Sequence, residues 1–135
     1  MKKVIIDSNI VFSALRGKSS LTRDKILNSQ DKYYAPNFLI GEIFKHKERI
    51  LKKSKASEEE TLEYLLKILS RIKFISEDSI STGNFIAAYR LCKDIDEEDT
   101  PFIALSLELE YELWTRDEKL KSGLTKKGFN NFYEE

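Results

Sequence analysis

The chain alternates short apolar segments that suit β-strands with segments of helical spacing, and this alternation restricts the folds open to it. The first apolar segment, Lys3 to Ile6, is rich in β-branched residues and is followed at once by Asp7-Ser8. Such a pattern predicts a buried strand that passes into a turn or a helix cap. Apolar residues then recur with helical spacing from Ile10 to Leu15, ahead of Gly17. A strand, a carboxylate at its carboxyl end and a helix are therefore expected in this order.

The same alternation continues along the chain. Asn37 is expected to cap a long helix, and Ser57 and Glu60 have the spacing of a capping box. The expected strands cover residues 3–6, 32–35, 74–75, 112–115 and 129–132, and the expected helices lie around residues 10–15, 20–30, 38–51, 57–69, 85–91, 100–109 and near Leu120. Strands that alternate with helices favour a mostly parallel sheet covered on both faces. We therefore expect an α/β chain in three layers, α/β/α, with four or five strands.

Length and composition fit a single folded domain. The chain has 135 residues, of which 41% are hydrophobic and 34% charged, with only five Gly and two Pro. This composition argues against disordered, collagen-like and low-complexity chains. No segment has the character of a linker, so we expect one domain over residues 1–135.

Cysteine usage and hydropathy indicate the compartment. Cys92 is the only cysteine, and its place in a helical run predicts a buried, unreactive thiol. The amino terminus is basic and then apolar, but the apolar run from Val4 to Ile6 is too short for a signal peptide. No apolar stretch approaches the roughly 20 residues that span a bilayer. We therefore expect a cytoplasmic protein without a membrane segment.

Charge is balanced over the whole chain but uneven along it. The 23 basic residues match the 23 acidic ones, so no general attraction to nucleic acid is expected. Residues 45–55 nevertheless contain six Lys or Arg, and residues 94–99 contain five acids around one isoleucine. The basic stretch is interpreted either as a solvated helix face or as a surface that follows the phosphates of a nucleic acid.

Four acids from distant parts of the sequence are candidates for one pocket. Asp7 and Asp117 each follow an expected strand, at the end of the sheet where α/β proteins bind ligands. Asp99 precedes a helix that begins with Thr100-Pro101, and Glu42 lies in the first turns of the helix after the second strand. Carboxylates that meet repel one another unless a cation lies between them. Oxygen ligands select Mg²⁺ or Mn²⁺, and such ions suit phosphodiester hydrolysis.

Each of these acids also has a simpler interpretation. Asp7 and Asp117 each suit the N-cap of the following helix. Glu42 has no capping explanation, and its simpler interpretation is a surface glutamate at the edge of an apolar stripe. His46, four residues later, is the only histidine; without further zinc ligands it is interpreted as a surface side chain.

At this point the ordered motifs resemble those of PIN domains, the nucleases that include VapC-type toxins. The resemblance extends from Lys3 to about Leu124 in the expected order. The motifs are Val4 to Asn9, Ile40 to Ile43, Asp96 to Leu105, and Leu113 to Asp117 with Leu120. The resemblance implies a PIN-like fold for the predicted three-layer domain.

The same resemblance assigns roles to individual residues. It implies that Asp7, Glu42, Asp99 and Asp117 are the acids that bind metal. It also suggests Ser8 or Thr115 as supports that donate hydrogen bonds. Asp96 matches an acidic position before the third motif, and Asp99 is preferred over it because Thr100-Pro101 places Asp99 at a helix start. Arg116 replaces the small residue of many relatives and is expected to contact a phosphate or to reach solvent.

The expected function is therefore a metal-dependent endoribonuclease. Asp7, Asp99 and Asp117 would hold Mg²⁺ or Mn²⁺, and Glu42 would complete the shell or orient the attacking water. In-line attack with departure of the 3′ oxygen predicts products with a 5′ phosphate. The resemblance implies a toxin with an antitoxin partner, and a homodimer. The alternative is a PIN fold that binds RNA or protein with little or no turnover.

Overall fold

A central sheet of four parallel strands organises the computed structural model, which describes all residues 1–135. The strands are β1 (Lys3–Ile6), β2 (Lys32–Pro36), β3 (Ile72–Ile75) and β4 (Glu112–Trp114). Their order is β3-β2-β1-β4, and Val4 of β1 lies opposite Tyr33 of β2 and Glu112 of β4. All four strands end at the same edge of the sheet, since all pairs are parallel. The predicted α/β class and parallel sheet are confirmed.

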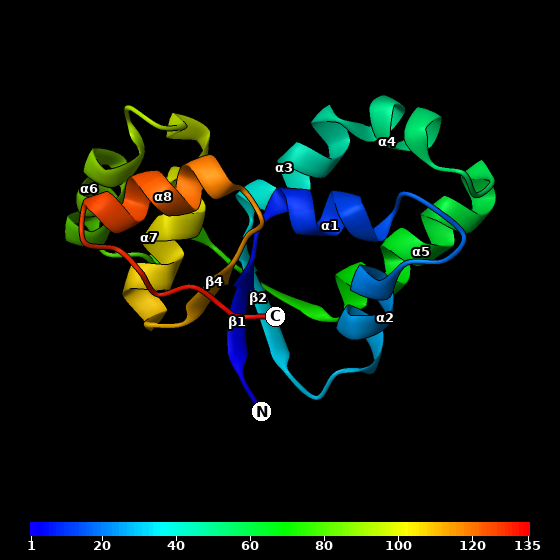
Figure 1. Cartoon of the computed structure of the whole chain (residues 1–135), viewed down its shortest axis with the longest axis horizontal. Helices are drawn as coiled ribbons and strands as arrows, with labels where there is room; N and C mark the ends of the chain where they lie inside the picture. The colour runs from blue at the N-terminus through cyan, green and yellow to red at the C-terminus, as the bar shows by residue number, and fades with distance from the viewer.

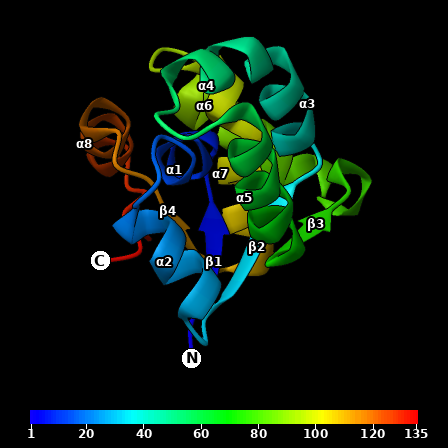
Figure 2. The same ribbon diagram turned by 90° about the vertical axis from the view of Figure 1, so that its right-hand side faces the viewer.

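Eight α-helices cover this sheet. They are α1 (Ser8–Ala14), α2 (Leu21–Asn28), α3 (Phe38–Lys45), α4 (Lys47–Lys53), α5 (Glu58–Ser70), α6 (Thr82–Cys92), α7 (Thr100–Leu109) and α8 (Glu118–Lys126), with 3₁₀ turns at Glu77–Ser79 and Glu97–Asp99. Helices α6, α7 and α8 lie on one side of the sheet, and α1, α2 and α5 lie on the other (Figure 1). Figure 2 shows the arrowhead of β1 directed toward α1, so the carboxyl end of β1 lies at the start of that helix.

Of the two helix caps predicted from the sequence, one forms as expected and the other does not. The Ser57 hydroxyl accepts from the Glu60 amide and the Glu60 carboxylate accepts from the Ser57 amide, so the predicted capping box is confirmed. Asn37 makes no side-chain cap bond, and the predicted cap is wrong there. Instead the Glu77 carboxylate accepts from the amides of Asn37 and Phe38 at 2.9 and 3.1 Å. A residue 40 positions later thus replaces the expected cap.

Two predicted elements differ in the structure. The long helix after Asn37 is broken at His46 into α3 and α4. The last predicted strand is reduced to one isolated bridge between Leu113 and Phe132, in which the Leu113 amide donates to the Asn131 carbonyl and the Tyr133 amide donates to the Leu113 carbonyl. The sheet therefore ends at β4.

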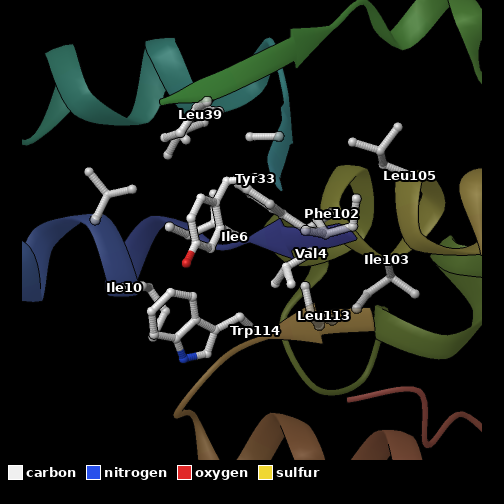
Figure 3. Packing of buried hydrophobic residues seen from close by; sticks show 14 of the residues in the cluster. Val4, Ile6, Ile10, Tyr33, Leu39, Phe102, Ile103, Leu105, Leu113 and Trp114 are labelled. Carbon is white, nitrogen blue, oxygen red and sulfur yellow. The ribbon is translucent and has the colours of Figure 1, made fainter. Parts of the chain in front are cut away.

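The core fills both sides of the sheet around β1 and α7. Trp114 is fully buried, and its ring centroid lies 5.9 Å from that of Tyr33 (Figure 3). Helix α7 buries Phe102, Ile103 and Leu105, as expected of a central helix. Cys92 is also fully buried, as predicted, and burial raises the pKa of its thiol to about 12. None of the helices has both the length and the apolar character needed to cross a bilayer.

Arg23 holds the loop between α1 and α2. Its guanidinium is 4% exposed, stacks on Tyr64 at 3.7 Å and donates to the carbonyls of Ala14, Gly17 and Lys18 at 2.9, 2.9 and 2.6 Å. Arg23→Met would leave these carbonyls unpaired, so the free energy of unfolding is expected to fall by about 2–4 kcal/mol. Urea unfolding measures the loss, and the exposed Arg16→Met serves as the control. Equal stabilities of the two variants would contradict this role.

Candidate active site

Asp7 and Asp117 lie just beyond the ends of two neighbouring strands, β1 and β4. Asp7 directly follows β1, and its amide donates to the Trp114 carbonyl at the end of β4 at 3.3 Å. The Asp7 Oδ1 accepts from the Ile10 amide at 3.0 Å, and the Asp117 Oδ1 accepts from the Leu120 amide at 3.0 Å. Both acids are therefore N-caps, of α1 and α8. Capping occupies one oxygen of each carboxylate and leaves the other for a ligand.

Thr115 joins these two acids. Its side chain is buried, and its hydroxyl oxygen accepts from the Asp117 amide at 3.2 Å. Burial raises the pKa of Asp7 from 3.8 to about 6, while hydrogen bonding from Thr115 and from the Ile10 amide opposes the rise. The nearby Asp117 carboxylate raises the Asp7 pKa further. Thr115 thus lies between two acids that repel each other.

Glu42 is buried, in contrast to its simpler interpretation as a surface residue. The residue is 8% exposed, and its Oε2 lies 3.2 Å from the His46 Nε2. The His46 side chain is 26% exposed and packs edge-on against Phe12 with ring centroids 5.7 Å apart, so it is partly buried at the surface. The break between α3 and α4 at His46 accompanies this placement. The spacing of four residues between Glu42 and His46 is the sequence feature that could have predicted this pairing.

Asp99 is the acid with the most carboxylate neighbours. Its pKa is raised to about 7, first by burial and then by the charges of Asp96, Asp7, Asp117 and Glu42. Asp99 makes no side-chain cap bond to α7, so its carboxylate is free at the helix start. Asp96 is exposed and accepts from the Glu98 amide at 3.0 Å. The other three predicted acids and Asp96 therefore lie within electrostatic range of Asp99.

A small cavity opens within this group of acids. It has a volume of about 120 Å³. Its lining residues are Ser8, Asn9, Phe12, Glu42, His46, Arg49, Asp96, Glu98, Asp99 and Phe102. We call it the acidic cavity. Glu42, Asp96 and Asp99 line it together with Ser8, whereas Asp7, Thr115 and Asp117 are not part of its lining.

The donor set fits a hard divalent cation in its chemistry. No three side chains of His, Cys, Asp or Glu converge closely enough to hold one ion directly in this structure. Carboxylates of like charge repel one another when no cation lies between them. Burial first, and neighbouring carboxylates after it, raise the pKa values of Asp7 and Asp99. Oxygen donors of this kind suit Mg²⁺ or Mn²⁺, and the one thiol, Cys92, is fully buried.

Comparison with known proteins places the chain in a family. The family model described as the PIN domain matches residues 5–134. The chain belongs to the PIN domain family. The crystal structure of VapBC2 from Rickettsia felis, bound to a DNA fragment from their promoter, superposes with a TM-score of 0.64 at 16% identity. The match covers 98% of this chain and 97% of that one, so the two share a fold. Among curated proteins, none matches the sequence.

Two cationic features of this PIN domain differ from the simplest sequence interpretation. The Arg116 side chain is 42% exposed, and its guanidinium donates two bonds to the Glu135 carboxylate at 2.6 and 2.9 Å, so it reaches solvent as part of an ion pair. A second cavity, of about 60 Å³, is lined by Asn9, Phe12, Leu15, Arg16, Arg49, Ile50 and Lys53. We call it the basic cavity. It shares Asn9, Phe12 and Arg49 with the acidic cavity, so the PIN domain has cations beside its acids.

Proposed function

We propose that this PIN domain is an endoribonuclease that depends on Mg²⁺ or Mn²⁺. Members of the family are generally nucleases. The observation that carries the proposal is the gathering of acids from separate parts of the chain around Asp99, whose pKa is raised first by burial and then by the charges of those acids. Such a concentration of negative charge is costly for a fold, and a divalent cation removes the cost.

Each acid has a proposed role in holding the ion and the water. Asp7, Asp99 and Asp117 hold the ion, and Glu42 completes the shell or orients the attacking water. A bound ion of this kind lowers the pKa of water and neutralises charge on the phosphate. Thr115 keeps Asp7 and Asp117 in position, while Ser8 and Asp96 adjoin them as supports. In-line attack at phosphorus, with departure of the 3′ oxygen, gives a 5′-phosphate product.

The basic cavity supports a nucleic acid as the substrate. Arg16, Arg49 and Lys53 are exposed, and none forms an ion pair within the chain. Unpaired cations beside the acidic cavity can hold a backbone phosphate next to the one that is cut. Of the two sequence interpretations of the basic stretch, the phosphate-binding one is therefore proposed for Arg49 and Lys53.

Arg49→Gln is expected to weaken binding of RNA without removing the acids. The Michaelis constant should rise by about 3- to 10-fold, and the salt dependence of binding should become shallower by about one ion. Steady-state cleavage and binding at several salt concentrations measure both quantities. Lys67→Gln is the charge-matched control, because Lys67 lies on α5 and lines neither the acidic nor the basic cavity. A fall in turnover with an unchanged Michaelis constant would contradict this role of Arg49.

A toxin with an antitoxin partner is the proposed biological setting. The support is the fold shared with VapBC2. Exposed apolar side chains provide surfaces for association, because Ile40 and Phe44 of α3 are 40% and 70% exposed. We propose a homodimer or a complex with an antitoxin at such surfaces. Expression should arrest growth of the host, and co-expression of a neighbouring antitoxin gene should restore it.

The nuclease proposal is tested with purified protein and labelled RNAs. Single-stranded and structured RNAs are incubated with Mg²⁺, with Mn²⁺ or with EDTA, and product ends are analysed for a 5′ phosphate. Cleavage that requires the metal and yields 5′ phosphates is the expected result. RNA or protein binding without cleavage in either metal would instead favour the alternative, a PIN fold that serves as a binding module.

A further inference from the structure

A third, larger hollow adjoins the acidic cavity. Its lining contains aromatic residues, whereas that of the basic cavity contains Arg16, Arg49 and Lys53. The third hollow has a volume of about 750 Å³, within the range of about 300–1,000 Å³ that is typical of small-molecule sites. Residues of α3, α6 and the start of α7 line it. Its aromatic lining residues are Phe38, Phe85 and Tyr89, and we call it the aromatic groove.

The aromatic groove is continuous with the acidic cavity. Glu42 and Glu98 line both. The acidic cavity in turn shares Arg49 with the basic cavity, so the three hollows follow one another across the protein surface. At the junction, Lys45 pairs with Glu98 at 3.5 Å, and both side chains are more than half exposed. A strand of RNA whose phosphates lie at the acids and at Arg49 therefore has the groove within its path.

Aromatic side chains line the groove, and one of them is exposed. Tyr89 is 44% exposed and its hydroxyl makes no hydrogen bond, and Phe85 lies four residues earlier on the same face of α6. Phe38 is partly buried and packs edge-on against Phe102 with ring centroids 6.1 Å apart. Phe38 is thus held by the core, whereas Tyr89 leaves a ring open to a ligand.

Charge selects the part of an RNA that can enter. Glu97 and Glu98 line the groove and repel a phosphate, and Lys45 is already paired with Glu98. A neutral base does not suffer this repulsion, and stacking on an aromatic ring is open to every base. The groove therefore suits the base of a nucleotide, while the backbone runs along the cationic side.

We propose that the aromatic groove is a base-binding subsite for an unpaired nucleotide next to the cleaved bond, with Tyr89 as the stacking ring. The inference rests on the proposed nuclease function for its substrate. Single-stranded RNA suits this subsite, because a paired base is not free to leave its helix and stack on a side chain. Phe85 and Phe38 complete the apolar walls.

Binding is measured without turnover, in EDTA and in the Asp7→Asn variant with Mg²⁺. Short single-stranded RNAs carry the fluorescent base 2-aminopurine at successive positions, and stacking quenches it. Quenching at one position is expected for the wild-type chain. Tyr89→Ala should remove this quenching and weaken binding by about tenfold, since stacking contributes about 1–3 kcal/mol per base. Tyr89→Phe should retain both the quenching and the affinity of the wild type. Ile86→Ala is the control, because Ile86 has a similar exposure on the same helix, and it should bind and quench like the wild type.

An abasic RNA separates stacking from a structural role of Tyr89. Removal of the quenched base should weaken binding to the wild type by the same factor, and Tyr89→Ala should no longer distinguish the two RNAs. If Tyr89→Ala lowers the affinity for intact RNA and for abasic RNA by the same factor, the subsite is refuted. Unchanged affinity of Tyr89→Ala for intact RNA would also refute it and would favour a protein segment as the occupant of the groove. Cleavage without a Tyr89 effect keeps the nuclease and refutes the subsite; stacking on Tyr89 without cleavage keeps the subsite and refutes the nuclease.

Discussion

Asp7→Asn is expected to lower the rate of RNA cleavage by at least about 100-fold and, in the same protein, to stabilise the metal-free fold. Loss of a charged group that acts on developing charge costs about 10²–10³ in rate. Asparagine caps helices as well as aspartate does, so the bond from the Ile10 amide is retained. The variant removes the charge and keeps the local structure.

The expected gain in stability follows from the burial of Asp7. The residue is 5% exposed, and its pKa is raised from 3.8 to about 6. At pH 8 the ionised carboxylate therefore costs the metal-free fold up to about 3 kcal/mol, which a neutral amide does not. Thermal unfolding in EDTA at pH 8 should show a higher midpoint for Asp7→Asn than for the wild type.

A matched control separates this effect from a general loss of negative charge. Asp94 is exposed and pairs with Lys127, outside the acidic cavity. Asp94→Asn should leave the cleavage rate unchanged and the unfolding midpoint nearly so. If Asp7→Asn cleaves RNA at the wild-type rate, Asp7 has no part in the chemistry. If its unfolding midpoint in EDTA is also lower than that of the wild type, Asp7 serves only as a helix cap.

A divalent cation is expected to stabilise the fold strongly at pH 8 and only weakly at pH 5. The pKa values of Asp7 and Asp99 are raised to about 6 and about 7 in the folded chain. Groups with raised pKa values contribute their full stability below about pH 4, where both states are protonated, and lose it as the pH rises through 6 and 7. The metal-free protein should therefore become less stable from pH 5 to pH 8.

Mn²⁺ or Mg²⁺ should reverse this loss because it binds the ionised acids of the folded chain. The midpoint of thermal unfolding is measured at pH 5 and pH 8, with the metal and with EDTA. Carboxylates with lowered pKa values, such as Asp31, lose their contribution only at more acidic pH and do not disturb this range. The same increase at both pH values, or none at pH 8, would show that the acids do not hold the ion. Asp7→Asn should weaken the increase at pH 8.

Local signals in the sequence predicted the elements of this fold well. The β-branched run before Asp7, the capping box at Ser57 and the start of α7 at Thr100-Pro101 each depend on residues close in sequence. The parallel sheet follows from the alternation of strands with helices. The break at His46 and the missing last strand depend on packing between distant segments, which spacing alone does not reveal.

The acids were predictable as a set, but their surroundings were not. The positions of Asp7 and Asp117 after strands place them at one edge of the sheet from sequence alone. The pairing of Glu42 with His46, and of Arg116 with Glu135, requires side-chain directions that only the folded chain provides. The aromatic groove is likewise formed by segments that are distant in sequence, and Phe85 and Tyr89 show only helical spacing there. The metal-binding roles of the acids stay a prediction.

Helix α3 is tied at its start to a turn that follows β3, through the Glu77 carboxylate. The helix carries Glu42, yet the residues of that turn line neither the acidic cavity nor the aromatic groove. Withdrawal of Glu77 would leave the Phe38 amide without its acceptor, whereas the Asn37 amide would keep its bond to the Ile75 carbonyl at 3.1 Å. A change at this turn, whose residues lie outside both hollows, would thus reach the first turn of the helix that carries Glu42.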